Sequence, residues 1–215
     1  MDEKHNALYS YDEKNHTIHI HDFWTRRYMD DKVLNPTPNI TADITVYISP
    51  QYHRVDSTKE RNSSFNNYNT PTFVRYFIYD DNNHLVRVTD NWQDSHRTRQ
   101  VDKTEIEWDG ENIVSAKSRN SDMTFTPSCI SYTCPPNDCR TYFLSVLERP
   151  LLAAGLFGKT PKHLPSSWID GTYRTDFKYN IENDNIASAN IVGSNNGKPH
   201  ESFIETYVWE SPTSK

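Results

Sequence analysis

The segment Tyr76-Phe-Ile-Tyr-Asp-Asp-Asn-Asn-His-Leu-Val-Arg-Val88 decides the fold class. An alternating run that ends in an aromatic residue is followed by a turn rich in Asp and Asn, and then by a second alternating run. This order is typical of two antiparallel strands joined in a β-hairpin. Three other segments repeat it, from Tyr9 to Ile20, from Glu105 to Ala116 and from Phe177 to Ala189. The repetition predicts an all-β protein.

The hairpins follow one another closely enough to predict a single sheet. We expect one curved, partly open antiparallel meander sheet, a half-barrel of about ten to twelve strands. One domain would span residues 1–215, with a first hairpin and two long loops, at 24–43 and 50–71, in residues 1–72. Residues 73–209 would hold the rest of the meander. Loops of this length are natural places for partner contacts, although plain disorder is the simpler interpretation.

One stretch lacks the β pattern, and we name residues 142–157 the apolar segment. It reads Tyr142-Phe-Leu-Ser-Val-Leu-Glu-Arg-Pro-Leu-Leu-Ala-Ala-Gly-Leu-Phe157. Glu148, Arg149 and Pro150 divide it into two pieces, which predicts short helical turns. We expect this helical plug to cover the strand at residues 73–79, which is apolar on both sides, through Leu147, Leu151, Leu152, Leu156 and Phe157. The alternative is a mobile lid that opens to admit a ligand.

Composition excludes several classes of protein. Apolar residues make up only 34% of the chain and aromatic residues 13%, which predicts a thin core built from large rings. The 23 Lys and Arg residues are scattered and outnumbered by 29 Asp and Glu residues, for a net charge of −6. This argues against a nucleic-acid partner.

The sequence shows no targeting segment. No run is long and apolar enough to cross a membrane as a helix, and Met1-Asp-Glu-Lys-His5 lacks the apolar core of a signal peptide. Either the protein is cytosolic, or a leader was removed before the sequence begins.

Three cysteines, Cys129, Cys134 and Cys139, lie around Pro135 and Pro136. A disulfide between Cys134 and Cys139 would close a loop that the two prolines already bend, leaving Cys129 unpaired. A zinc site is a weaker interpretation because the spacing is wrong and a fourth ligand is missing. We expect no cofactor.

His19 and His21 are the candidate metal ligands. On a strand both imidazoles would face the same side, so they could share a metal with Asp22 or with a neighbouring strand. The alternative is an ordinary solvated polar face, because two ligands alone do not make a metal site.

Aromatic side chains are the candidates for ligand binding. The tryptophans could form a stacking platform for sugars or for an apolar ligand, although most of them are expected in the core. The candidates are Trp24, Trp92, Trp108, Trp168 and Phe157.

No residue set specifies a reaction. The sequence has no Gly-x-Ser-x-Gly elbow, and paired carboxylates such as Asp80 and Asp81 or Glu105 and Glu107 fall in turns or on polar strand faces. We therefore predict no catalytic residue, and an enzyme is the less favoured class.

Four patterns now coincide: the aromatic-Asp hairpins, Trp108 to Val114, the apolar segment, and Leu156 to Pro165 before a further strand. Together they resemble an uncharacterised family of secreted lipoproteins from gut bacteria with a porin-like fold. The resemblance covers roughly residues 73–209. It implies an extracytoplasmic location, in the cell envelope or on the outer surface, and a lipid anchor on a cysteine near the start of the precursor. It implies no activity.

Three functions stay open at this stage. The first is a non-enzymatic extracytoplasmic module that binds a small molecule, a lipid, a glycan or an envelope protein. The second is a hydrolase that acts on glycans or lipids, and the third is a purely structural envelope protein. We expect a monomer without a transmembrane span.

Overall fold

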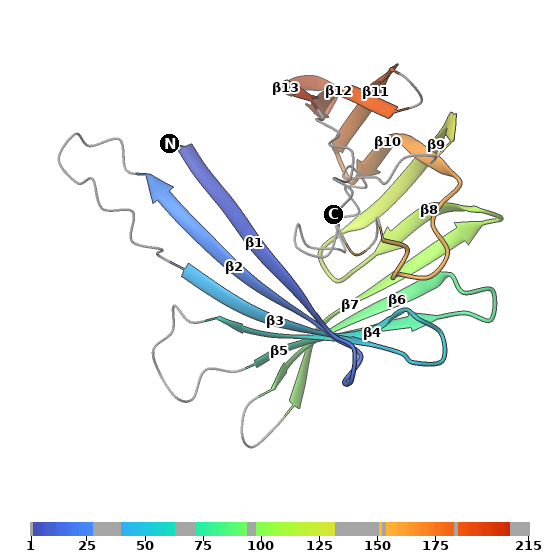
Figure 1. Ribbon diagram of the computed structural model, residues 1–215. Helices are drawn as coiled ribbons and strands as arrows, with labels where there is room; N and C mark the ends of the chain where they lie inside the picture. Colours follow the sequence, from blue (N-terminus) through green and yellow to red (C-terminus); the bar gives the residue numbers. More distant parts are fainter. Residues whose placement is uncertain are drawn as a thin grey trace. The chain divides into compact units, whose positions relative to one another are not determined.

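The computed structural model describes residues 2–27, 40–62, 72–93, 98–131, 151, 154–182 and 185–206. These residues form an open antiparallel meander sheet of thirteen strands, in which neighbours in the chain are neighbours in the sheet. Figure 1 shows this succession from blue β1 to red β13. The strands are β1 (Asp2–Asp12), β2 (Thr17–Arg27), β3 (Ile40–Ile48), β4 (Val55–Asn62), β5 (Thr72–Tyr79), β6 (Leu85–Gln93), β7 (Thr98–Asp109), β8 (Asn112–Lys117), β9 (Asp122–Ser131), β10 (His163–Asp170), β11 (Tyr173–Glu182), β12 (Asn185–Asn195) and β13 (Lys198–Thr206).

Turn chemistry explains why the predicted hairpins form. In the β5–β6 turn the Asp80 carboxylate accepts the backbone N–H of His84 at 2.8 Å, and Asn83 takes the left-handed conformation with φ 67°. Asp and Asn tolerate such turns because their side chains hydrogen-bond the nearby backbone. The β1–β2 turn uses the same device, since Asp12 accepts the Asn15 side-chain amide at 2.7 Å. All four predicted hairpins are paired in the structure.

The Asp80 carboxyl makes the fold sensitive to acid. Burial raises its pKa, but hydrogen bonds from His84 and Asn82 outweigh that effect and leave the pKa below the ordinary value. A carboxyl group with a lowered folded-state pKa stabilises the fold above its unfolded-state pKa, and this contribution is lost as the pH falls through the folded-state pKa.

We expect Asp80→Asn to melt at a lower temperature than wild type at about pH 6, with the difference in melting temperature closing toward about pH 2. Melting curves over this range, with the exposed Asp81→Asn as control, check it; a gap that stays constant contradicts it.

The chain divides into two compact units. Unit 1 comprises Met1–Thr104 and Leu144–Lys159, and unit 2 comprises Glu105–Phe143 and Thr160–Lys215. The boundary falls inside β7, so the two units share a strand in sequence. A single domain over residues 1–215 stays a prediction.

The core of unit 1 follows the period of two that strands require. In β3 the side chains of Ala42, Ile44 and Val46 are buried, whereas Asp43 between them and Tyr47 after them are exposed. Each fully buried aliphatic side chain stabilises the fold by about 1.5–3 kcal/mol relative to an exposed one. Further buried residues of this unit are Ile20, Val55, Phe77, Leu85 and Val88.

The end of the apolar segment packs on unit 1. Phe157 is only 1% exposed, and its ring meets the ring of Phe77 edge to face with centroids 4.9 Å apart. Backbone bonds fix the same stretch, since Val55 donates to the Leu156 carbonyl at 2.7 Å and Lys159 donates to the Asn83 carbonyl at 2.7 Å. This part of the segment therefore covers β5, as the sequence predicts.

Arg54 contacts residues in and beside two turns near the Phe77–Phe157 contact. The Arg54 guanidinium lies 4.5 Å from the ring centroid of Tyr52 and 4.1 Å from that of Tyr79, and it donates to the Asn83 side chain. The Tyr79 hydroxyl donates to the Val55 carbonyl at 2.7 Å. Burial raises the pKa of Tyr79 well above its ordinary value, and the Arg54 cation offsets part of that rise. Tyr79 therefore stays a neutral donor.

Unit 2 has a separate core of aromatic and aliphatic side chains. Trp168 of β10 lies opposite Phe125 of β9, and Phe177 of β11 lies opposite Ile191 of β12. All four are buried, together with Met123, Leu164 and Ala189. Large rings contribute much of this core, as the composition predicts.

Two expectations about the strands are wrong. The described residues hold thirteen strands rather than about ten to twelve. β4 (Val55–Asn62) occupies much of the predicted loop 50–71, and β10 (His163–Asp170) is a strand that the sequence pattern did not show. Both strands are hydrogen-bonded on two sides, so pairing rather than hydrophobic alternation makes them strands.

The expected helical plug lies mostly outside the described residues. Of residues 142–157 the structure describes Leu151, which has helical conformation, and residues 154–157, which form turns. Gly155 and Gly158 adopt positive φ values, a conformation that commonly ends a right-handed helix. Residues 142–150, 152 and 153, including Leu147 and Leu152, lie outside the described residues. Among the residues that are described, no helix is long and apolar enough to cross a membrane.

Candidate functional site

Strand register places two rows of side chains on one face of unit 1. Residues directly opposite each other in antiparallel strands share a face of the sheet. The first row, from β2 to β6, is Ile20, Ile44, Glu60, Phe73 and Trp92, and the second is Ile18, Val46, Thr58, Arg75 and Asp90. Both rows change along their length, from aliphatic on β2 and β3 to aromatic and charged on β5 and β6.

The first row ends in the exposed ring of Trp92, which packs against the ring of Phe73. Phe73 and Trp92 lie directly opposite each other, with ring centroids 6.1 Å apart and planes inclined at 81°. This edge-to-face contact is a preferred aromatic geometry. Trp92 remains 44% exposed, so Phe73 holds an indole ring that solvent still reaches.

The second row ends in an ion pair. The Arg75 guanidinium makes a bidentate contact with the Asp90 carboxylate, in which Nε donates to Oδ1 at 2.6 Å and Nη2 donates to Oδ2 at 3.0 Å. The two side chains are only 16% and 17% exposed, so the pair is largely screened from water and fixed in orientation. The guanidinium also lies 5.7 Å from the ring centroid of Phe73, which joins the ion pair to the aromatic pair.

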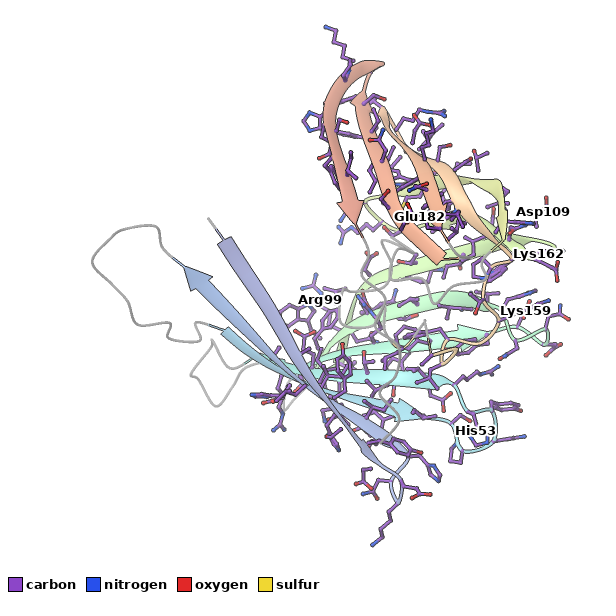
Figure 2. All side chains as sticks on the ribbon, turned by 45° about the horizontal axis from the view of Figure 1, so that its top comes forward. His53, Arg99, Asp109, Lys159, Lys162 and Glu182 are labelled. Atoms are coloured by element: carbon purple, nitrogen blue, oxygen red, sulfur yellow. The ribbon has the colours of Figure 1, made fainter. Side chains whose placement is uncertain are left out.

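We name Glu60, Phe73, Arg75, Asp90 and Trp92 the Trp92 patch. Figure 2 shows His53 and Lys159 at the turn end of the strands of unit 1 and Arg99 toward the other end. Trp92 comes late in β6, after the strand has run from the Asp80–His84 turn, and so lies toward the end marked by Arg99. Arg75 is two residues from Phe77 on the same face of β5 and Phe73 is four residues from it, so the patch begins beside the Phe157 contact and extends away from it.

The other predicted ligand-binding residues lie elsewhere. Phe157 and Trp168 are buried in the cores of units 1 and 2, and Trp108 is half-buried at the end of β7. Trp24 belongs to β2, but its side chain lies outside the described residues. Only Trp92, among these candidates with a described side chain, is exposed.

His19 and His21 lie on the opposite face of unit 1, as their spacing predicts. His21 bonds the Asp43 carboxylate, and the His19 ring approaches the hydroxyls of Thr17 at 3.3 Å and Thr45 at 3.5 Å. The structure gathers no group of three metal-ligating side chains in the residues that it describes. The disulfide expected between Cys134 and Cys139 lies outside those residues.

Sequence reasoning did not find four members of the patch, Glu60, Phe73, Arg75 and Asp90. The available signal was the position of the β5–β6 turn, because residues equally far from the centre of a hairpin turn face each other. Pairing residues outward from this turn without any shift places Arg75 opposite Thr89 and Phe73 opposite Asn91, one residue short of their true partners. The register shift between Ile78 and Tyr79 moves the pairing by that one residue, to Asp90 and Trp92.

Comparison with known proteins supports the fold. A crystal structure of a porin-like protein from Bacteroides uniformis is similar over 94% of this chain and 88% of its own, with a TM-score of 0.58 and 12% sequence identity. No family model matches the chain, and no curated protein matches it. The likeness establishes the fold alone. The porin-like open antiparallel sheet is confirmed, whereas membership of the gut-bacterial lipoprotein family, secretion and lipidation stay predictions.

Proposed function

We propose that the protein is a non-enzymatic binding module of the bacterial cell envelope and that the Trp92 patch is its binding surface. The observation that carries the proposal is the exposed Trp92 ring, held by Phe73 beside the fixed Arg75–Asp90 pair. Exposed aromatic rings with a few oriented polar groups are typical of binding surfaces. The likeness to a bacterial porin-like protein supports the envelope location.

Thermal stabilisation tests the proposal with a broad set of probes. The protein is screened against a glycan panel and against vesicles of neutral and anionic phospholipid. A true ligand is expected to raise the melting temperature by about 5 °C or more at roughly one hundred times its Kd. We expect this shift to vanish in Trp92→Ala.

Tyr76→Ala is the matched control. Tyr76 lies on β5 and is 47% exposed, but it faces the side of the sheet opposite to Phe73 and Arg75. The ligand-induced shift is expected to survive this substitution. A shift that is lost equally in both variants contradicts a surface at Trp92. Failure of every probe to bind favours the structural alternative, and release of cleaved product from a glycan or lipid favours the hydrolase.

A further inference from the structure

β1 is an edge strand of unit 1. All 11 of its residues pair with β2 without a register shift, and among the strands that the structure describes β2 is its sole neighbour. An edge strand directs a row of backbone N–H and C=O groups away from its sheet, where another strand can pair with them. The β1 edge is therefore a place where unit 1 can accept a further strand.

The sequence of β1 lacks the features that usually keep an edge strand from pairing. Natural edge strands are protected by proline, by charged side chains or by a β-bulge. The stretch Asn6-Ala-Leu-Tyr-Ser-Tyr11 contains no proline and no charged residue. β13, the strand at the other end of the meander, contains Pro199 and Glu201, and its pairing with β12 shifts register. β1 is thus the less protected of the two edges.

Two large side chains of β1 are exposed, one on each face of the sheet. Leu8 is 65% exposed and lies on the same face as His21, and Tyr11 is 59% exposed and lies on the same face as Ile18. A strand added beside β1 places its own side chains against residues on both faces. Pairing at this edge therefore removes apolar surface from water on both sides of the sheet.

We propose that two copies of this chain form a dimer through their β1 edges, antiparallel and about a two-fold axis perpendicular to the sheet. This axis keeps equivalent faces of the two sheets on the same side, so even-numbered residues pair with even-numbered ones. With the axis at Leu8, residues 4–12 of each copy pair, and Leu8 lies opposite the partner's Leu8. The Trp92 patch stays uncovered because β2 and β3 separate β1 from the strands of the patch. The dimer therefore goes beyond the proposed function and does not depend on it.

The charges along β1 favour a second copy as the occupant, in this register. With the axis at Leu8, Lys4 falls opposite the partner's Asp12, and the two-fold symmetry makes this pairing of opposite charges twice. An axis at Ala7 instead sets Asp2 opposite the partner's Asp12, which brings like charges together twice. The β1 sequence is therefore complementary to itself when the axis passes through Leu8.

Sedimentation velocity of the whole chain over the micromolar range of concentration tests the dimer. We expect a species of twice the chain mass of 25.1 kDa to accumulate as the concentration rises. Leu8→Lys is expected to raise the dissociation constant of the dimer by at least about tenfold, because lysine on an edge strand opposes pairing and the axis sets two lysines opposite each other. Hydrogen exchange of the backbone amides of residues 7–11 is expected to slow as the dimer forms.

Ile204→Lys is the matched control. Ile204 is 69% exposed on β13, the other edge strand, and its substitution is expected to leave the dissociation constant unchanged. Tyr11→Lys serves as a second variant if circular dichroism shows that Leu8→Lys does not fold. A chain that stays monomeric at every concentration, as expected from the sequence, overturns the inference. A dimer that the folded β1 variants leave intact, or that Ile204→Lys weakens equally, also overturns it.

Discussion

Replacing Phe157 with alanine is expected to lower the free energy of unfolding by about 3–5 kcal/mol. The Phe157 ring is 1% exposed and meets Phe77 at 4.9 Å, so its removal leaves a cavity over β5 that the backbone cannot easily close. The hydrogen bonds of Leu156 and Lys159 hold the segment at a fixed distance from Val55 and Asn83. Urea unfolding followed by circular dichroism measures the loss.

Ile78→Ala is the control for this prediction. Ile78 lies on β5 next to Phe77, but its side chain is 41% exposed on the opposite face, and its truncation is expected to cost less than about 1 kcal/mol. A loss below about 1 kcal/mol for Phe157→Ala would show that the segment is held weakly. That result would reject the covering role and favour a lid that opens for a ligand.

The hairpins were predictable because their signals are local. Asp80 accepts backbone N–H groups within its own turn, and Asp12 does the same with Asn15. Such contacts depend on residues a few positions apart, so the sequence shows them directly. The covering of β5 by Phe157 was predictable for another reason: an apolar stretch next to polar strands has to be buried somewhere.

β4 and β10 were not predictable from local pattern. β4 reads Val55-Asp-Ser-Thr-Lys-Glu-Arg-Asn62, which shows no apolar alternation, and its strand conformation depends on pairing with β3 and β5. β10 contains Pro165, which argues against a strand with neighbours on both sides. Register shifts on both sides of Pro165 in the β9–β10 pairing accommodate it.

A single register shift explains why the sequence did not predict the Trp92 patch. The β5–β6 pairing shifts register between Ile78 and Tyr79, so that Tyr79 pairs with Leu85 but Ile78 pairs with Arg87. Without this β-bulge, Arg75 would lie opposite Thr89 instead of Asp90, and Phe73 opposite Asn91 instead of Trp92. One extra residue in a strand exchanges the two faces, and no sequence signal marks where it occurs.

Gly158→Ala is expected to destabilise unit 1 by at least about 2 kcal/mol more than Gly155→Ala. Both glycines have positive φ, 76° and 74°, so both substitutions force an alanine into the left-handed region at a similar cost of about 1–2 kcal/mol. They differ in what surrounds the new methyl group. A Cβ at Gly158 would lie 2.4 Å from the Asn83 carbonyl oxygen and 3.1 Å from the Tyr79 ring, whereas nothing lies within 4 Å at Gly155.

Gly158→Ala costs more stability because the atom nearest to the new methyl group belongs to the backbone and cannot rotate away as a side chain can. The Asn83 carbonyl belongs to the backbone of the β5–β6 turn and accepts the N–H of Lys159, so relief of the clash breaks that bond and lifts Phe157 from Phe77. Urea unfolding of the two variants, compared with each other, removes the shared backbone strain from the measurement. Equal losses would mean that the Phe157–Lys159 stretch moves away freely, which would also undermine the large effect expected for Phe157→Ala.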